Sequence, residues 1–180
     1  MISIRLALGS LLVSAAMIGC MNPGTVSGGG HVIDKSGKPI ANFGMWADTC
    51  SGDLLHPEGH LNWVDKAGSV KLNGQLSLHG QCVSEDDWQG TWYSEKCELL
   101  CVPLFGYGTH VAQVDYRSTN PKKPGSGVAI ACLKDNGEGV NKIAGDQVAL
   151  FAISGVYAGY ISAGTVRGNV QSGVCTDGVE

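Results

Sequence analysis

The chain has 180 residues, with 12 lysines and arginines against 16 aspartates and glutamates, a formal net charge of −4. This length is enough for one domain with a real core. The mild acidity and the lack of a basic cluster exclude nucleic acid as the expected partner, because its binding depends on clustered lysine and arginine. The two lysines of "PKKPG" (121–125) indicate a solvated turn.

The first 19 residues have the pattern of a secretory signal peptide. Arg5 supplies a positive charge, and an apolar stretch covers residues 6–18. This stretch is shorter than the roughly 20 apolar residues that a membrane-spanning helix needs, and small residues stand near its end. A buried helix is the alternative, which Gly9, Ser10 and Ser14 disfavour.

The junction "MIGC" resembles the lipobox of bacterial lipoproteins, in which a small residue precedes a cysteine that receives a diacylglycerol thioether. Gly19 and Cys20 match this pattern, whereas Met17 departs from the usual leucine. The resemblance implies a mature protein that begins at Cys20 and is held to the membrane by acyl chains such as palmitate, at about 0.8 kcal/mol per buried CH₂. The residue after the lipidated cysteine is Met21 and not the aspartate that is associated with retention in the inner membrane of enteric bacteria. If the source is Gram-negative, the resemblance therefore implies the outer membrane.

Seven cysteines would leave one unpaired in an exported protein, but assigning Cys20 to lipid leaves an even number. An oxidising compartment then favours disulfides, each stabilising the fold by about 2–4 kcal/mol. Zinc is the alternative, but no histidine pair at ligand spacing follows Cys97 and Cys101, the closely spaced pair of cysteines. The six candidates, whose pairing the sequence leaves open, are Cys50, Cys82, Cys97, Cys101, Cys132 and Cys175.

Short runs that alternate apolar and polar residues follow one another along the chain, a pattern typical of half-buried strands. They cover residues 31–37, 42–50, 59–74 (two strands joined near Ala67-Gly68), 75–82, 110–116, 127–133, 147–154, 157–162 and 165–171. Phe43 and Met45 are expected on one face with Trp46 opposite, and Leu76 and Leu78 opposite His79. The pattern predicts an all-β antiparallel fold of about eight to ten short strands, either a β-sandwich or a closed barrel.

One insertion interrupts the strands. Ser84 suits the cap of a short helix that acidic residues follow, and Cys97 and Cys101 have helical spacing. The predicted organisation is a signal peptide (1–19), a flexible glycine- and serine-rich tether (20–27), one β domain (28–175) with a disulfide-rich insertion (84–107), and a tail (176–180).

Four stretches carry a further pattern: "GGGHVIDKSGKPIANFGMWAD", "EGHLNWVDKAGSVKLNG", "LKDNGEG" and "AGDQVALFAISGVYAGYISAGTVRGNVQ". In this order, over most of residues 28–171, they resemble the post-COAP family of bacterial β-domains. The insertion and the cysteines lie outside the shared pattern. The resemblance implies a secreted β-domain and carries no established catalytic function.

The turn "DNGE" is the best metal candidate, because Asp135, Asn136, Glu138 and the later Asp146 are oxygen ligands of the kind that Ca²⁺ prefers. Their spacing does not match an EF-hand loop. The competing interpretation is a hairpin turn, for which Asn136-Gly137 supplies the positive φ values. We expect the turn, and no cofactor.

His60 and Asn62 share one face of a predicted strand, with Trp63 opposite. Such a pair suits a ligand or a cross-strand hydrogen-bond network. The sequence contains no catalytic motif, and a nucleophile at Cys82 beside His79 would have to escape disulfide pairing.

Trp88, Trp92 and Tyr93, with Phe105 and Tyr107 nearby, concentrate aromatic side chains in the insertion. They form either a contact surface or a small satellite core around the cysteines. The leading hypothesis is a non-enzymatic, lipid-anchored envelope domain with a structural, adhesive or recognition role, whose partners are the membrane and an envelope protein or surface ligand. The alternative is a secreted hydrolase or a small-ligand or calcium-binding module that uses His60, Asp65 or the Asp135–Glu138 turn.

Overall fold

The structure is a computed structural model that describes residues 24–50, 57–83, 95–137 and 145–175. Its strands are β1 (Gly24–Ile33), β2 (Pro39–Asp48), β3 (Glu58–Asp65), β4 (Val70–Gln81), β5 (His110–Ser118), β6 (Ser126–Lys134), β7 (Gln147–Ala152) and β8 (Ile161–Val174). The short helical elements are η2 (Cys97–Cys101), α2 (Val102–Phe105) and η3 (Gly155–Tyr157).

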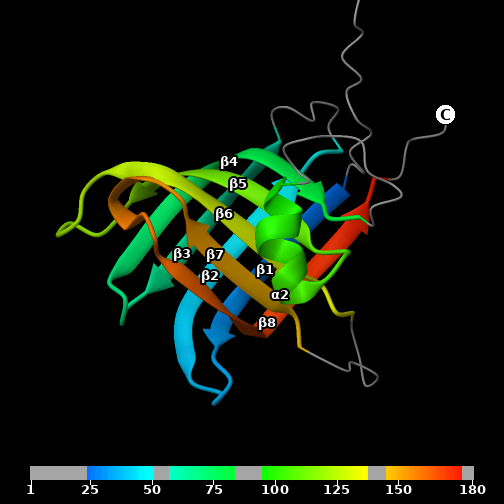
Figure 1. The fold of residues 1–180 in the computed structure, drawn as a ribbon, viewed down its shortest axis with the longest axis horizontal. Coiled ribbons are helices and arrows are strands. Elements are labelled where there is room, and N and C mark those ends of the chain that lie inside the picture. The colour runs from blue at the N-terminus through cyan, green and yellow to red at the C-terminus, as the bar shows by residue number, and fades with distance from the viewer. Residues whose placement is uncertain (1–23, 51–56, 84–94, 138–144, 176–180) are drawn as a thin grey trace, which may run out of the picture.

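The eight strands form a closed antiparallel barrel (Figure 1). Each strand pairs with the next along the chain, and β8 returns to pair with β1 over ten residues. The predicted all-β antiparallel fold is confirmed, and of its two forms the closed barrel is the one present. Closure pairs both sides of every strand and leaves no free edge among the described strands.

Residues 24–27, predicted as part of the flexible tether, belong to the barrel instead. β1 begins at Gly24 and pairs with β2 on one side and β8 on the other. Gly30 (φ +146°) faces Gly168 (φ +157°) across the β1–β8 seam. A Cβ on Gly168 would collide with the backbone of Gly29, so glycine here permits close strand approach.

Two further predicted strands, 157–162 and 165–171, are replaced by one long strand. The 14 residues of β8 run without interruption, and residues 155–157 form the 3₁₀ turn η3 before it. The long strand has partners along its whole length because β7 covers its first part and β1 covers the rest.

Alternate residues of each strand fill the barrel. Phe43 and Met45 point inward and Trp46 outward, as the alternation predicts. Trp63 is fully buried, and its indole N–H donates to the Tyr160 hydroxyl at 3.0 Å. That hydroxyl donates in turn to Asp65 at 3.0 Å. Burial raises the pKa of Tyr160 to about 12.

A second apolar cluster lies outside the barrel, between η2 and the outer face of β5, β6 and β7. It consists of Cys82, Cys97, Cys101, Val111, Ile130, Cys132 and Ala149, with Phe105 packed against it. Disulfides join Cys82 to Cys97 and Cys101 to Cys132, and a third joins Cys50 to Cys175. The predicted disulfides are confirmed, and the first two fasten the insertion to the barrel wall.

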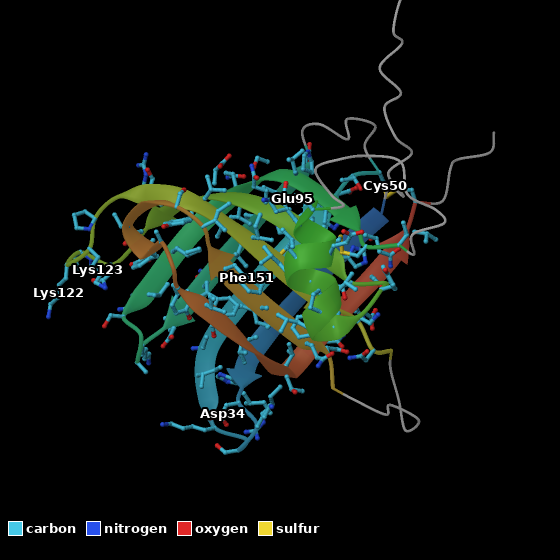
Figure 2. All side chains as sticks on the ribbon, viewed as in Figure 1. Asp34, Cys50, Glu95, Lys122, Lys123 and Phe151 are labelled. Carbon is cyan, nitrogen blue, oxygen red and sulfur yellow. A yellow bond between two sulfur atoms is a disulfide. The ribbon has the colours of Figure 1, made fainter. Side chains whose placement is uncertain are left out.

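The barrel has two distinct ends. One end, which we call the cysteine end, contains the start of β1, the end of β8 and the Cys50–Cys175 disulfide. At the tyrosine end, the segment between β7 and β8 folds over the barrel through Tyr157, whose N–H donates to the Tyr116 hydroxyl at 3.0 Å. Figure 2 shows Cys50 far from Lys122 and Lys123, which extend from the loop between β5 and β6.

Candidate functional site

Two rows of outward-facing residues cross β2 to β6 on the outside of the barrel. The row nearer the cysteine end consists of Trp46, His60, Gln75, Asp115 and Val128, each paired with the next in the sheet register. The row nearer the tyrosine end consists of Gly44, Asn62, Asn73, Arg117 and Ser126. Five strands therefore bring polar side chains from distant parts of the sequence onto one surface.

Strand alternation explains this arrangement. The inward positions of β3 are taken by Leu61 and Trp63, both fully buried, so His60 and Asn62 between them point to solvent. The predicted shared face of His60 and Asn62, opposite Trp63, is present. The same alternation in β5 buries Val114 and Tyr116 and exposes Asp115 between them.

The two rows line a shallow groove of about 770 Å³, a volume within the range of small-molecule sites. We call it the polar groove and define it by His60, Asn62, Asn73, Gln75, Asp115 and Arg117, all of them exposed. Trp46 stands at its margin, 38% exposed and edge-on to the ring of His60 at a centroid distance of 5.7 Å.

The polar side chains of the groove have no protein partners. Within the described part of the chain, none of the six makes a hydrogen bond or an ion pair with another residue. Their neighbours differ: Gln113 donates to the Ser77 hydroxyl at 3.1 Å, and His31 pairs with Asn42 across β1 and β2. The groove therefore offers several free donors and acceptors to a ligand.

His60 and Asp65, proposed together for a hydrolase, lie on opposite faces of β3. Asp65 is buried and accepts hydrogen bonds from the Gly68 N–H at 2.7 Å and the Tyr160 hydroxyl at 3.0 Å. His60 points outward into the polar groove. The five-residue spacing puts the two side chains on opposite sides of the sheet, so they do not form one site.

Asp135 and Asp146, the two aspartates of the calcium candidate, accept hydrogen bonds from backbone N–H groups. Asp135 accepts from Gly137 N–H at 2.7 Å and from Ser172 N–H at 2.9 Å. Asp146, fully buried, accepts from Asn136 N–H at 3.1 Å and Val170 N–H at 2.8 Å. These bonds fasten this part of the connection between β6 and β7 to β8. The predicted tight hairpin is not formed, because Gly137 has a positive φ (+80°) and Asn136 does not, and Lys134 pairs with Gln147 rather than with a residue directly after the turn.

The calcium candidate is described only in part. Among the residues that the structure describes, no three His, Cys, Asp or Glu side chains gather as metal ligands. Glu138 lies outside the described residues.

A histidine pair inside the barrel is not apparent from the sequence. His79 and His110 are almost fully buried, with Nε2 of His79 3.1 Å from Nδ1 of His110. A β-bulge between Leu76 and Leu78 shifts the register of β4, which turns His79 inward rather than outward as predicted. Burial lowers the pKa of His79 to about 3 and of His110 to about 4.

The suggested nucleophile at Cys82 is excluded by its disulfide with Cys97. Of the aromatic residues in the insertion, Trp88, Trp92 and Tyr93 lie outside the described residues. Phe105 packs against the second apolar cluster, in agreement with the interpretation that the aromatic residues surround the cysteines. Tyr107 is 43% exposed.

Cys20 also lies outside the described residues, and its lipidation stays a prediction. None of the described helices is long and apolar enough to cross a membrane. Comparison of the chain with known protein families, with curated proteins and with solved structures finds no match.

Proposed function

We propose that this protein is a lipoprotein of the bacterial envelope whose barrel is a non-catalytic recognition module, binding a surface ligand in the polar groove. The observation that carries the proposal is the set of polar side chains without protein partners on a rigid, concave surface. Strands that are paired on both sides hold the backbone under these groups in place, so binding has to order the side chains but not the backbone.

The anchor follows from the lipobox resemblance and is consistent with the three disulfides, which suit an oxidising compartment. β1 begins only four residues after Cys20, a distance of at most about 14 Å for an extended chain. The acylated cysteine therefore keeps the cysteine end near the bilayer. The polar groove, with its second row toward the tyrosine end, is left accessible from the aqueous side.

The non-catalytic role rests on how the groove residues are distributed. Asp115 and Arg117 are its charged side chains, and the structure describes no ion pair or hydrogen bond that would orient either one for proton transfer. His60 has Trp46 beside it rather than a carboxylate. Such a surface suits binding through many weak contacts.

Retention on envelope fragments tests the recognition surface. The full chain, purified in a detergent without a sugar headgroup, is mixed with washed envelope fragments and sedimented. We expect the Asn62→Ala/Arg117→Ala double variant to lose about tenfold or more of its affinity, since each lost hydrogen bond contributes about 0.5–1.5 kcal/mol.

Ser36→Ala/Lys122→Ala, in loops at the tyrosine end, serves as the matched control and is expected to bind like the wild type. Equal retention of the groove variant and the wild type would remove the groove from the function.

Intact-mass analysis of the membrane fraction tests the anchor separately. The expected product starts at Cys20, carries acyl chains and titrates no free thiol. A Cys20→Ser variant would lose the acyl mass. Recovery of the unacylated, full-length wild-type chain would contradict the envelope assignment.

A further inference from the structure

We propose that the ligand of the polar groove is a neutral oligosaccharide, with one sugar ring against Trp46 and its hydroxyl groups bonded to the two rows. The inference rests on the proposed function and specifies its ligand class. It follows from the kinds of side chain in the groove, their charge balance and the space beside Trp46.

The amide groups of Asn62, Asn73 and Gln75 each offer one acceptor and one donor group side by side. Neighbouring sugar hydroxyls each donate and accept, so they match a side-chain amide in both directions. Asp115 adds acceptors and Arg117 adds several donors in a planar fork. All five groups are exposed and without protein partners among the described residues, so no internal hydrogen bond must be broken on binding.

The charge balance favours a neutral ligand. Asp115 and Arg117 lie two residues apart on the outer face of β5 and carry opposite charges. A polyanion would place several negative charges near Asp115, and Arg117 is the one basic residue of the groove that could pair with them. Sites for nucleic acids and other polyanions instead contain clusters of basic residues.

A polypeptide ligand is less well matched. The barrel is closed, so an extended peptide finds no strand edge in the described sheet to which it can add. Protein interfaces concentrate aromatic and other apolar residues at their centre, yet the centre of this groove holds Asn73 and Gln75. A protein partner is therefore an outcome of the test rather than part of the proposal.

Trp46 and Gly44 together provide a place for a sugar ring. Trp46 is an exposed aromatic residue on the same outer face, beside His60. Two residues away, Gly44 lies in the second row, and a Cβ built there would meet no atom within 4 Å. The open space over Gly44 lets a sugar ring lie beside the indole, whose apolar surface suits the C–H face of a pyranose.

The length of the platform suits an oligomer rather than a single sugar. From β2 to β6 the rows cross four inter-strand spacings, about 19 Å in all. Several linked rings therefore fit along the rows, and each of the strands β3, β4 and β5 contributes hydrogen-bonding groups to them.

Isothermal titration calorimetry with defined sugars tests the proposal. The full chain, in the amine oxide detergent LDAO, is titrated with N-acetylchitohexaose, cellohexaose, maltohexaose and laminarihexaose, and with a heparin hexasaccharide as the anionic probe. We expect at least one neutral hexasaccharide to bind at millimolar concentration or below, and to bind more tightly than the heparin fragment.

Substitutions locate the binding. Trp46→Ala is expected to weaken it by about tenfold, and Trp46→Phe to retain most of it. Tyr107→Ala, which removes an exposed aromatic ring from the insertion, is the matched control and is expected to bind like the wild type. Thermal unfolding of each variant establishes that the barrel is intact.

The results separate this inference from the proposed function. If none of the neutral sugars binds, or if Trp46→Ala and Asn62→Ala leave sugar binding unchanged, the carbohydrate inference is overturned. If groove variants still lose retention on envelope fragments, and protease treatment of the fragments abolishes wild-type retention, the groove recognises a protein. The recognition function then stands and its ligand class is wrong.

Discussion

The imidazole rings of His79 and His110 meet edge to edge inside the barrel. Their ring centroids are 5.3 Å apart with planes tilted by 7°, and the facing nitrogens are 3.1 Å apart. The centroid distance is close to the nitrogen separation plus the two ring radii, so the contact is an in-plane hydrogen bond. The outer nitrogens, Nδ1 of His79 and Nε2 of His110, are buried without a partner among the described residues.

We predict that this pair makes the fold sensitive to acid. Burial is the main cause that lowers both pKa values below 6.5, to about 3 and about 4; Asp135 partly opposes the shift of His110 and Lys134 adds to it. Well above pH 6.5 both rings are neutral whether the chain is folded or unfolded. As the pH falls from there, the unfolded chain takes up protons first, and each histidine removes about 1.4 kcal/mol of stability per pH unit.

Denaturant unfolding at pH 7 and pH 5 measures the effect. The wild type is expected to lose about 4 kcal/mol more over this interval than a His79→Leu/His110→Met variant, in which the pair is apolar. His31→Gln, an exposed site on β1, is the control and should follow the wild type. An equal loss in the apolar variant would show that other groups cause the acid sensitivity.

Removing the Tyr160 hydroxyl should destabilise the tyrosine end. Tyr160→Phe leaves the indole N–H of Trp63 buried without its acceptor and takes one donor from Asp65. We expect a loss of about 1–3 kcal/mol in the free energy of unfolding. Tyr107→Phe, at an exposed position, should change it little. An unchanged free energy of unfolding in Tyr160→Phe would mean that water replaces these hydrogen bonds.

The β1–β8 seam should not tolerate a side chain at Gly168. Its positive φ and the backbone of Gly29 opposite leave no room for a Cβ, so Gly168→Ala is expected to cost about 1–3 kcal/mol. Gly44→Ala, where a Cβ meets open space, should be close to neutral. Thermal unfolding compares the two, and similar effects would contradict the close approach at the seam.

The Cys50–Cys175 disulfide should contribute more stability than Cys82–Cys97. It closes a segment of 125 residues against 15, and the loop-entropy model gives about 4.7 kcal/mol for a 100-residue loop and about 3 kcal/mol for a 15-residue one. Unfolding of the two Cys→Ala double variants in denaturant measures the difference. A larger loss for the Cys82–Cys97 variant would indicate that fastening the insertion matters more than chain entropy.

The strands and their inward faces follow from the sequence because alternation is a local property, as Phe43 and Trp46 illustrate. The start of β1 was not predicted, because a glycine-rich sequence is found both in flexible tethers and in strands that approach closely, as Gly30 and Gly168 do. The inward turn of His79 depends on a bulge, which alternation alone does not predict.

The polar groove was predicted only at His60 and Asn62. Asn73, Gln75, Asp115 and Arg117 join them through the register of separate strand pairs. Register between strands is a tertiary property, fixed by the barrel as a whole. The sequence therefore indicated one strand of the site, and the fold supplies the others.

Photo-crosslinking in the host cell tests the recognition surface most directly. The full chain carries p-benzoylphenylalanine in place of Asn73, in the polar groove, or of Gln171, on the outer face of β8 across the barrel from β4. Irradiation is expected to produce an envelope adduct from position 73 and little from position 171. Adducts from position 171 without any from position 73 would contradict the account.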